Sequence, residues 1–357
     1  MKTGGLSILC SLCAAFSIAG GAAGELPRVV PQVGYELSGG AGHYDYAPSF
    51  ITDRYGIVYG YLCENRDPFE IVDYIYLYKG IPTVQGMKWQ PGTEVIEPSR
   101  TGWDDCHICD PDVREFHTTW KGKEHKWIMT YLGVDQWDCN HNQIGIALSD
   151  NIEGPWEKFP APVVPYEGRD RWGTGQSTSV VLNDSTIALF YHSTTDNGPF
   201  AMRMVDLRDL DNIDIGREYA VPFLSANTYV AVSDNWIYTV SEERSENYEK
   251  IPTWVGDLCV VRCKPRSGDL VADMTSPVNE WIEIGRVTPE LSGFPRNHNP
   301  GFLTDSRGWV PTEDSLTVYF TPAVTGDDWL WSYDLYSAVF DLGAFNRERD
   351  RKFKNRK

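Results

Sequence analysis

Ala47-Pro48-Ser49-Phe50-Ile51 places a small residue and a proline directly before an apolar run that favours a β-strand. The same kind of element, a small or polar residue followed by strand-forming residues, recurs four more times, roughly every 50 to 70 residues. The further copies are Asp110-Pro111-Asp112-Val113, Gln176-Ser177-Thr178-Ser179-Val180, Asn227-Thr228-Tyr229-Val230 and Asn299-Pro300-Gly301-Phe302-Leu303. Long repeats of this kind are typical of propellers, in which each copy begins one blade.

Two further strand-like runs follow each copy of this element. The second runs are Ile57–Cys63, Trp127–Leu132, Ile187–His192, Trp236–Ser241 and Leu316–Thr321. The third runs are Asp73–Tyr78, Gln143–Leu148, Phe200–Val205, Asp257–Val261 and Tyr333–Val339. Turn signals such as Asp53-Arg54-Tyr55-Gly56 separate several of them, and no long stretch has a helical period. The pattern predicts an all-β fold, a five-bladed β-propeller, with a large irregular all-β domain as the alternative.

The expected propeller also indicates where a functional site would lie. The innermost strand of every blade begins on one face of the disc, at the mouth of the central channel. The loop between the second and third strands opens on that same face. Residues at these two places are therefore expected to converge on one pocket, although they are far apart in the sequence.

Composition and charge narrow the class of ligand. The chain contains 13 Trp and 19 Tyr, and aromatic residues at this density serve both β-rich cores and sugar-binding faces. Sugar rings present C–H faces that pack flat on aromatic rings. The formal net charge of −18 disfavours nucleic acids and acidic membranes as partners, because both are negatively charged. An uncharged carbohydrate remains compatible with such a surface.

The first residues have the features of an export signal. A lysine at position 2 precedes an apolar stretch, and Ala22-Ala23-Gly24 offers a cleavage site before Glu25. We therefore expect a secreted, periplasmic or extracellular protein with a signal peptide at 1–24, a propeller domain at 25–345 and a basic tail at 346–357. A lipid anchor at Cys10 or Cys13 stays open, although Leu precedes each of them where a small residue would be expected. No later segment is apolar enough to span a membrane.

Six cysteines follow the signal, an even number that permits disulfides in an exported protein. Cys106 and Cys109 form a C-x-x-C pair beside Asp and His residues, which would suit zinc if a second pair of ligands were present. The sequence offers no such second pair. We expect instead a disulfide between Cys106 and Cys139, across one blade.

The second unit has the most specific motifs of the chain. They are Asp110-Pro111-Asp112-Val113, the Tyr-containing run 127–131 (WIMTY), the run 144–149 (IGIALS) and Gly154-Pro155-Trp156. In this order they resemble one blade of the family-43-like glycoside hydrolases. Tyr44 to Ser49, Gly175-Gln176 and Asn299 to Phe302 are similar to further blade starts in such proteins, so the resemblance extends over most of residues 40–340.

The resemblance implies a five-bladed propeller that hydrolyses polysaccharide or oligosaccharide, with inversion at the anomeric carbon in the best-known members. It also implies three acidic residues in the pocket: a general base, a second Asp that tunes pKa values and a Glu that acts as acid. Glycoside hydrolysis requires carboxyls of this kind. One must be protonated so that it can donate a proton to the leaving oxygen, while another must be ionised so that it can activate water.

The catalytic candidates are Asp45, Asp110 and Glu242. Asp45 is the predicted base, although the family's base stands directly before Pro, where this chain has Ala47. Asp110 directly precedes Pro at the start of an inner strand. Glu242 is the predicted acid. The family's Glu is expected at the start of an inner strand, but the later blades of this chain have amides there. Glu242 instead ends a second strand, which places it on the same face. Glu64 occupies the matching place in the first blade.

The predicted substrate-binding residues lie at inner-strand starts and at the ends of neighbouring strands, where they could bind sugar rings or hydroxyls. They are Tyr44, Tyr46, Asp73, Asp112, Gln176, His192, Asn227, Glu243 and Asn299. His298 is similar to a His near a central calcium in some relatives, so the resemblance implies a structural calcium there. The hydrolysis itself is expected to require no cofactor.

Two other functions fit parts of the sequence. A non-catalytic carbohydrate-binding propeller would keep the aromatic and amide residues without the full set of acids, as Gln176, Asn227 and Asn299 suggest. A sialidase-like propeller would need repeated Ser-x-Asp-x-Gly-x-x-Trp hairpins, and residues 149–156 resemble one only superficially. The first alternative stays open.

Overall fold

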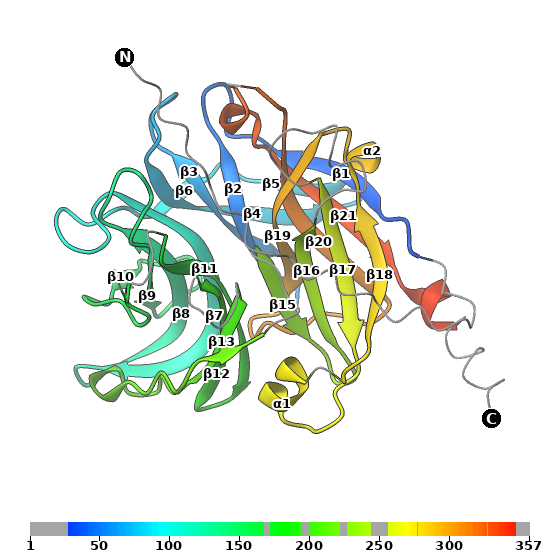
Figure 1. Cartoon of the computed structure of the whole chain (residues 1–357). Helices are drawn as coiled ribbons and strands as arrows, with labels where there is room; N and C mark the ends of the chain where they lie inside the picture. The colour runs from blue at the N-terminus through cyan, green and yellow to red at the C-terminus, as the bar shows by residue number, and fades with distance from the viewer. Residues whose placement is uncertain are drawn as a thin grey trace, which may run out of the picture.

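The computed structural model describes residues 28–167, 172–193, 200–221, 227–243, 256–276, 278–326 and 328–347. Within these ranges the chain forms five antiparallel blades whose innermost strands meet at a shared channel (Figure 1). The predicted all-β propeller is thus confirmed. The predicted signal peptide at 1–24 and most of the basic tail lie outside the described residues. No helix in the described ranges has the length and apolar character needed to cross a bilayer.

The blades follow one another along the chain, with the innermost strand first. Blade 1 comprises β2 (Asp45–Thr52), β3 (Val58–Asn65), β4 (Asp73–Thr83), β5 (Gly86–Trp89) and β6 (Thr93–Ile96). Blade 2 comprises β7 (His107–Trp120), β8 (Lys123–Val134), β9 (Gln143–Ser149) and β10 (Glu157–Lys158). Blade 3 comprises β11 (Thr174–Asn183), β12 (Thr186–Ser193), β13 (Phe200–Val205) and β14 (Tyr219–Ala220).

Blade 4 comprises β15 (Thr228–Val232), β16 (Ile237–Glu243), β17 (Asp257–Cys263) and β18 (Trp281–Val287). Blade 5 comprises β19 (Arg296–Thr304), β20 (Ser315–Ala323), β21 (Leu335–Asp341) and β1 (Gln32–Leu37). Two short α-helices, α1 (Leu270–Thr275) and α2 (Pro289–Ser292), flank the last strand of blade 4. Two 3-10 turns, at Leu210–Asn212 and Leu330–Ser332, complete the described elements. All the predicted strand runs lie within or largely overlap these strands.

The ring is closed by the N-terminal strand. β1 precedes blade 1 in sequence but pairs antiparallel with β21 as the outermost strand of blade 5 (Figure 1). The inner strands β19 and β2 also pair in parallel, Leu303 with Phe50 and Thr304 with Ile51. The two ends of the described chain are therefore held in the same sheet, so that blades 5 and 1 cannot separate without breaking backbone hydrogen bonds.

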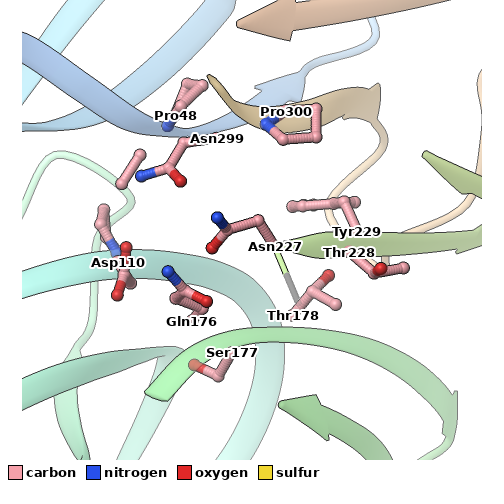
Figure 2. Close-up of a pocket in the computed structure, with 12 residues that line it drawn as sticks. Pro48, Asp110, Gln176, Ser177, Thr178, Asn227, Thr228, Tyr229, Asn299 and Pro300 are labelled. Carbon is pink, nitrogen blue, oxygen red and sulfur yellow. The ribbon is translucent and has the colours of Figure 1, made fainter. Parts of the chain in front are cut away.

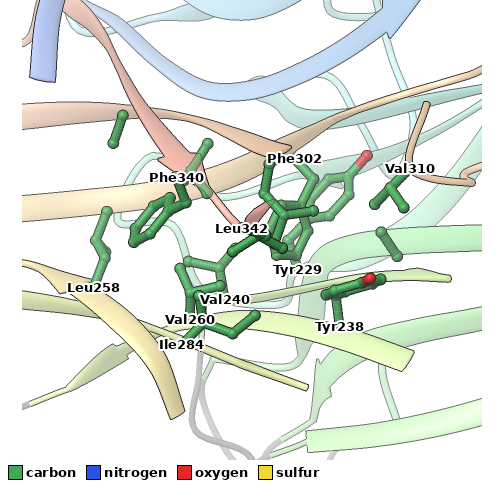
Figure 3. Close-up of a cluster of buried hydrophobic side chains, with 14 of the residues drawn as sticks. Tyr229, Tyr238, Val240, Leu258, Val260, Ile284, Phe302, Val310, Phe340 and Leu342 are labelled. Atoms are coloured by element: carbon green, nitrogen blue, oxygen red, sulfur yellow. The ribbon is translucent and has the colours of Figure 1, made fainter. Parts of the chain in front are cut away.

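The hydrophobic core is divided among the spaces between successive blades. Figure 3 shows the cluster between blades 4 and 5, in which Tyr229, Val240 and Ile284 pack with Phe302 and Phe340. Comparable clusters fill the spaces between blades 1 and 2, 2 and 3, 3 and 4, and 5 and 1. Because each blade presents apolar residues on both faces, the core is distributed around the channel in the spaces between blades.

A buried ion pair links four blades beneath the channel mouth. Asp112 Oδ1 lies 2.8 Å from Nη2 of Arg114, and both side chains are fully buried. Ser179 Oγ and Tyr229 OH donate to the Asp112 carboxylate at 2.6 and 2.9 Å, and Ser49 Oγ lies 3.3 Å from it. Arg114 in turn donates to the Ser179 carbonyl and to Tyr229 OH. The prediction that Asp112 binds substrate is therefore wrong, because its carboxylate has no exposed surface.

The disulfide also differs from the prediction. Cys63, on β3, is bonded to Cys109, on β7, and thus joins blade 1 to blade 2. Cys106 and Cys139 are both free thiols. Residues 106 and 109 lie near the same blade edge, and spacing alone did not indicate which of them meets a partner from the neighbouring blade.

Gly301 shows how closely the inner strands approach one another. A Cβ at this position of β19 would lie 2.3 Å from the Pro48 carbonyl oxygen of β2. We expect Gly301→Ala to lower the free energy of unfolding by about 1–3 kcal/mol, since backbone rather than a flexible side chain must move. Urea unfolding would measure it. Gly34→Ala is the control, because its Cβ would meet nothing nearer than 4.0 Å, and equal losses in both variants would contradict the account.

Candidate active site

The five predicted blade starts share one unusual backbone conformation. Each has a positive φ, which is uncommon for residues other than glycine. The values are 51° at Ala47, 48° at Asp110, 52° at Gln176, 51° at Asn227 and 42° at Asn299. All five line the same pocket, together with the residues that follow them (Figure 2). The recurring sequence element thus builds a ring of five side chains around the channel.

Asp110 is the carboxylate of this ring. It is 9% exposed, and its carboxylate accepts a hydrogen bond from the backbone N–H of Gln176 in the next blade. Burial and, second, the negative charge of Asp73 raise the pKa of Asp110 to about 7, despite the opposing effect of that hydrogen bond. A carboxyl with this pKa can hold or release a proton near neutral pH.

Asp73 organises the blade 1 side of the channel mouth. Its Oδ1 accepts hydrogen bonds from Tyr44 OH and Tyr46 OH, at 2.8 and 2.9 Å, and its Oδ2 lies 3.2 Å from Nδ1 of His107. Three of the predicted substrate-binding residues are therefore brought together. We refer to Asp73, Tyr44, Tyr46 and His107 as the Asp73 cluster. Tyr46 is half-buried, whereas the other three members are buried.

A second ionisable cluster lies on the blade 4 and blade 5 side. Glu242, at the end of β16, accepts hydrogen bonds from Nδ1–H of His298 and, at 2.9 Å, from the backbone N–H of Asn299. Arg296 Nη2 lies 3.1 Å from the same His298 nitrogen, and Arg296 also donates to Tyr333 OH. Burial alone would raise the pKa of Glu242, but His298, Arg296 and the Asn299 N–H outweigh it and lower that pKa.

The two clusters border one mouth. The rings of Tyr46 and Tyr333 stack with centroids 5.9 Å apart, and Tyr333 stacks on His298 at 5.5 Å. Glu242 and Asp110 each accept the backbone N–H of a channel residue in the next blade, Asn299 and Gln176 respectively. The catalytic roles predicted for Asp110 and Glu242 stay predictions, and the sequence did not indicate that His298 and Arg296 would contact Glu242.

Asp45 does not belong to the channel wall. A bulge between Tyr46 and Ser49, together with the left-handed conformation of Ala47, gives the channel position to Ala47. The Asp45 carboxylate is fully buried toward blade 5, where it accepts from the Gly39 N–H and lies beside Glu64 and Tyr78. Burial first, and then the charge of Glu64, raise the pKa of Asp45. Its predicted location at the channel is wrong.

The remaining predicted site residues divide into two groups. Gln176, Asn227 and Asn299 line the channel, and Oδ1 of both asparagines is buried with no hydrogen-bond partner in the described ranges. His192 lies at the end of β12 with its ring 4.5 Å from that of Trp172. Glu243 points away from Glu242 and pairs with Arg286 at 2.9 Å, so its predicted contact with substrate is not supported by its position.

The predicted calcium ligand is engaged in another contact. His298 Nδ1 meets Glu242, and the guanidinium of Arg296 lies beside that nitrogen, which disfavours a cation there. In the described ranges, one group of three His, Cys, Asp or Glu residues brings its ligand atoms within 4.8 Å of one another: Cys63, Cys109 and Asp110. Its two cysteines are bonded to each other. Nδ1 of His298 is thus occupied by Glu242, and the calcium stays a prediction.

Comparisons with known proteins show the fold. No protein-family model and no curated protein matches the chain. Among solved structures it is similar to Zg3597, a family 117 glycoside hydrolase of Zobellia galactanivorans, at a TM-score of 0.56 and 14% identity over 88% of this chain and 90% of that one. It is also similar to the catalytic domain of the Coprinopsis cinerea GH62 α-L-arabinofuranosidase, at 0.55 and 12% over 88% and 97%.

A third similar structure is the Xanthomonas citri GH43_1 enzyme in complex with xylotriose, at a TM-score of 0.52 and 12% identity over 85% of this chain and 90% of that one. At such identities a likeness concerns the fold and not the reaction. The chain shares the five-bladed propeller fold of glycoside hydrolases of families 43, 62 and 117.

Proposed function

We propose that this protein is a glycoside hydrolase that acts on an uncharged poly- or oligosaccharide at the channel mouth. One observation carries the proposal: Asp110 lines the channel, Glu242 is hydrogen-bonded to the backbone of the channel residue Asn299, and the environments of the two carboxyls move their pKa values in opposite directions. Glycoside hydrolysis requires one protonated and one ionised carboxyl. Pairs of titratable groups separated in this way mark acid and base assignments.

We assign the two catalytic roles from these environments, and the assignment differs from the one expected from the sequence. Asp110, with a pKa of about 7, is the general acid and protonates the leaving oxygen. Glu242 stays ionised and accepts the proton of the water that attacks the anomeric carbon. His298 and Arg296 act through Glu242: burial lowers the pKa of His298, so its N–H holds the carboxylate as a hydrogen-bond donor, and the positive charge of Arg296 favours the ionised form. The direct displacement by water gives inversion of configuration.

The same ring also supplies groups that bind a sugar. The asparagine oxygens at positions 227 and 299 lack partners in the described part of the chain, and buried acceptors of this kind gain from a hydroxyl donor. The half-buried rings of Tyr46 and Trp172 border the mouth beside them. The similar Xanthomonas citri enzyme is described in complex with xylotriose, which supports an oligosaccharide ligand for this site.

A carbohydrate-binding protein without catalysis is the second candidate. The specific observation in its favour is the channel ring, in which Ala47, Gln176, Asn227 and Asn299 accompany a single carboxylate. A site of this composition could bind hydroxyls without hydrolysing the bond. Only an activity measurement separates the two functions.

The test uses reducing-sugar release from a panel that includes arabinoxylan, arabinan, xylo-oligosaccharides and cello-oligosaccharides. We expect release from at least one of them, and a loss of at least a hundredfold in kcat for Asp110→Asn, which cannot donate the proton. The control is Glu313→Gln, on the opposite face, where Glu313 accepts from Ser233 and Asn235. Binding without release by the wild-type protein would overturn the hydrolase and favour the second candidate.

Asp73 is expected to tune the pH dependence of this reaction. Its negative charge contributes to the raised pKa of Asp110, so Asp73→Asn should lower that pKa. Because the acid must be protonated, activity is lost as pH rises through the pKa, and the alkaline limb of the kcat/KM profile should move to lower pH. An unchanged limb would show that Asp73 does not act on the group that titrates.

Export is part of the proposal. The predicted signal at 1–24 supports it, and so does the disulfide between Cys63 and Cys109, because such bonds persist in oxidising compartments. Detection of mature protein that begins near Glu25 in the extracellular or periplasmic fraction is the expected result.

A further inference from the structure

Two large aromatic side chains are exposed beside the channel mouth. Trp137, in the loop between β8 and β9, is 68% exposed, and among the tryptophans that the structure describes it alone falls in the exposed class. Phe69, in the loop between β3 and β4, is 67% exposed. A ring exposed to water forgoes the gain of burial, and two such rings in loops beside one mouth are placed to contact a ligand bound there.

Trp137 packs against the Asp73 cluster directly, and Phe69 is connected to it through Trp331. Trp137 meets His107 edge to face at 5.4 Å, and His107 in turn contacts Asp73. Phe69 meets Trp331 at 5.3 Å, and Trp331 lies 5.9 Å from Tyr44, which donates to Asp73. Trp137 therefore lies on the blade 2 side of the Asp73 cluster, and Phe69 lies on its blade 5 side.

The backbone holds Phe69 in a fixed and unfavourable conformation. Its φ is 64°, and its N–H donates to the Gly42 carbonyl at 2.8 Å. A Cβ at Gly42 would lie 2.8 Å from Cε2 of Phe69, so the ring rests directly on that glycine. A left-handed phenylalanine is rare and costly, and such conformations concentrate at sites that bind ligands.

We propose that Phe69 and Trp137 are outer sugar-binding positions that hold an uncharged polysaccharide chain on either side of the Asp73 cluster. The C–H faces of sugar rings stack on aromatic faces, and the net charge of −18 disfavours an anionic polymer. The inference rests on the proposed function in placing carbohydrate at the mouth. It adds that the substrate is a chain of several residues, longer than the channel mouth itself can hold.

Affinity gel electrophoresis tests the proposal with gels that contain arabinoxylan, arabinan or, as the anionic comparison, polygalacturonate. The wild-type protein should be retarded by at least one of the uncharged polymers and not by polygalacturonate. Phe69→Ala and Trp137→Ala should each weaken this binding roughly two- to tenfold, and the double variant more than tenfold. Tyr55→Ala is the matched control, because Tyr55 is equally exposed, at 68%, but lies in the β2–β3 turn on the opposite face.

The hydrolysis of a trisaccharide is measured in parallel and should be little changed in the double variant. The outer positions are overturned if none of the uncharged polymers retards the wild-type protein. They are also overturned if the double variant is retarded as strongly as the wild type, or if Tyr55→Ala loses as much binding. An equal loss on the trisaccharide and the polymer would overturn them as well. Retardation that depends on the two rings, without any hydrolysis, would support the outer positions and refute the hydrolase instead.

Discussion

Glu242→Gln should reduce hydrolysis by about two to four orders of magnitude, while the protein stays folded and continues to bind sugar. The amide keeps an oxygen that can accept the Asn299 N–H, but it carries no charge and cannot take a proton from water. The contact with His298 then loses its charge assistance. Steady-state kinetics on the substrate found in the panel, with thermal unfolding as the check on folding, measures the effect.

The kinetic pattern identifies the step that Glu242 serves. Since the base acts in the transition state, kcat should fall while KM changes little. In Glu242→Ala, azide or formate should restore part of the activity, because a small anion can occupy the space that the truncated side chain leaves. A variant that keeps more than a tenth of the wild-type kcat would contradict the assignment of Glu242 as base.

Asp112→Ala should produce the largest loss of stability. It leaves the guanidinium of Arg114 buried without its counter-ion, and removing one partner of a buried pair costs about 3–5 kcal/mol. The Ser179 and Tyr229 hydroxyls would lose their acceptor as well. Urea unfolding followed by tryptophan fluorescence measures the change, and a loss below about 1 kcal/mol would contradict it.

A double replacement separates the unpaired charge from the lost packing. In Asp112→Leu with Arg114→Met no charge remains buried, so a substantial part of the stability should return. Arg114→Met alone should remain strongly destabilised, because the carboxylate of Asp112 is then the unpaired group. Equal stability of the double variant and Asp112→Ala would show that the loss comes from packing alone.

The fold could be predicted from the sequence because the same blade-start element recurs in all five blades. Each blade start combines a left-handed residue with a strand, and five copies support one another even where a single copy such as Gln176-Ser177 is weak. Closure was not predictable, since β1 pairs with β21 across almost the whole chain and nothing local in Gln32–Leu37 marks its partner.

The candidate site was predicted only in part. The places of Asp110 at an inner-strand start and of Glu242 at the end of a second strand follow from the blade pattern, while their catalytic roles stay predictions. Asp45 was misplaced because the bulge after Tyr46 redirects it, and a bulge has no clear sequence mark here. The partnership of His298 with Glu242, from blades 5 and 4, depends on how adjacent blades pack, and no spacing along the chain reports such a contact.

The crystal structure of Glu242→Gln with a bound oligosaccharide tests the central claim most directly. The account predicts a sugar residue at the channel mouth, with its glycosidic oxygen within hydrogen-bond reach of Asp110 and its anomeric carbon facing position 242. The two carboxyl positions should be about 6.5–9.5 Å apart, with room for one water between the sugar and residue 242. An oligosaccharide bound away from Asp110, or one whose glycosidic oxygen lies far from both groups, would contradict it.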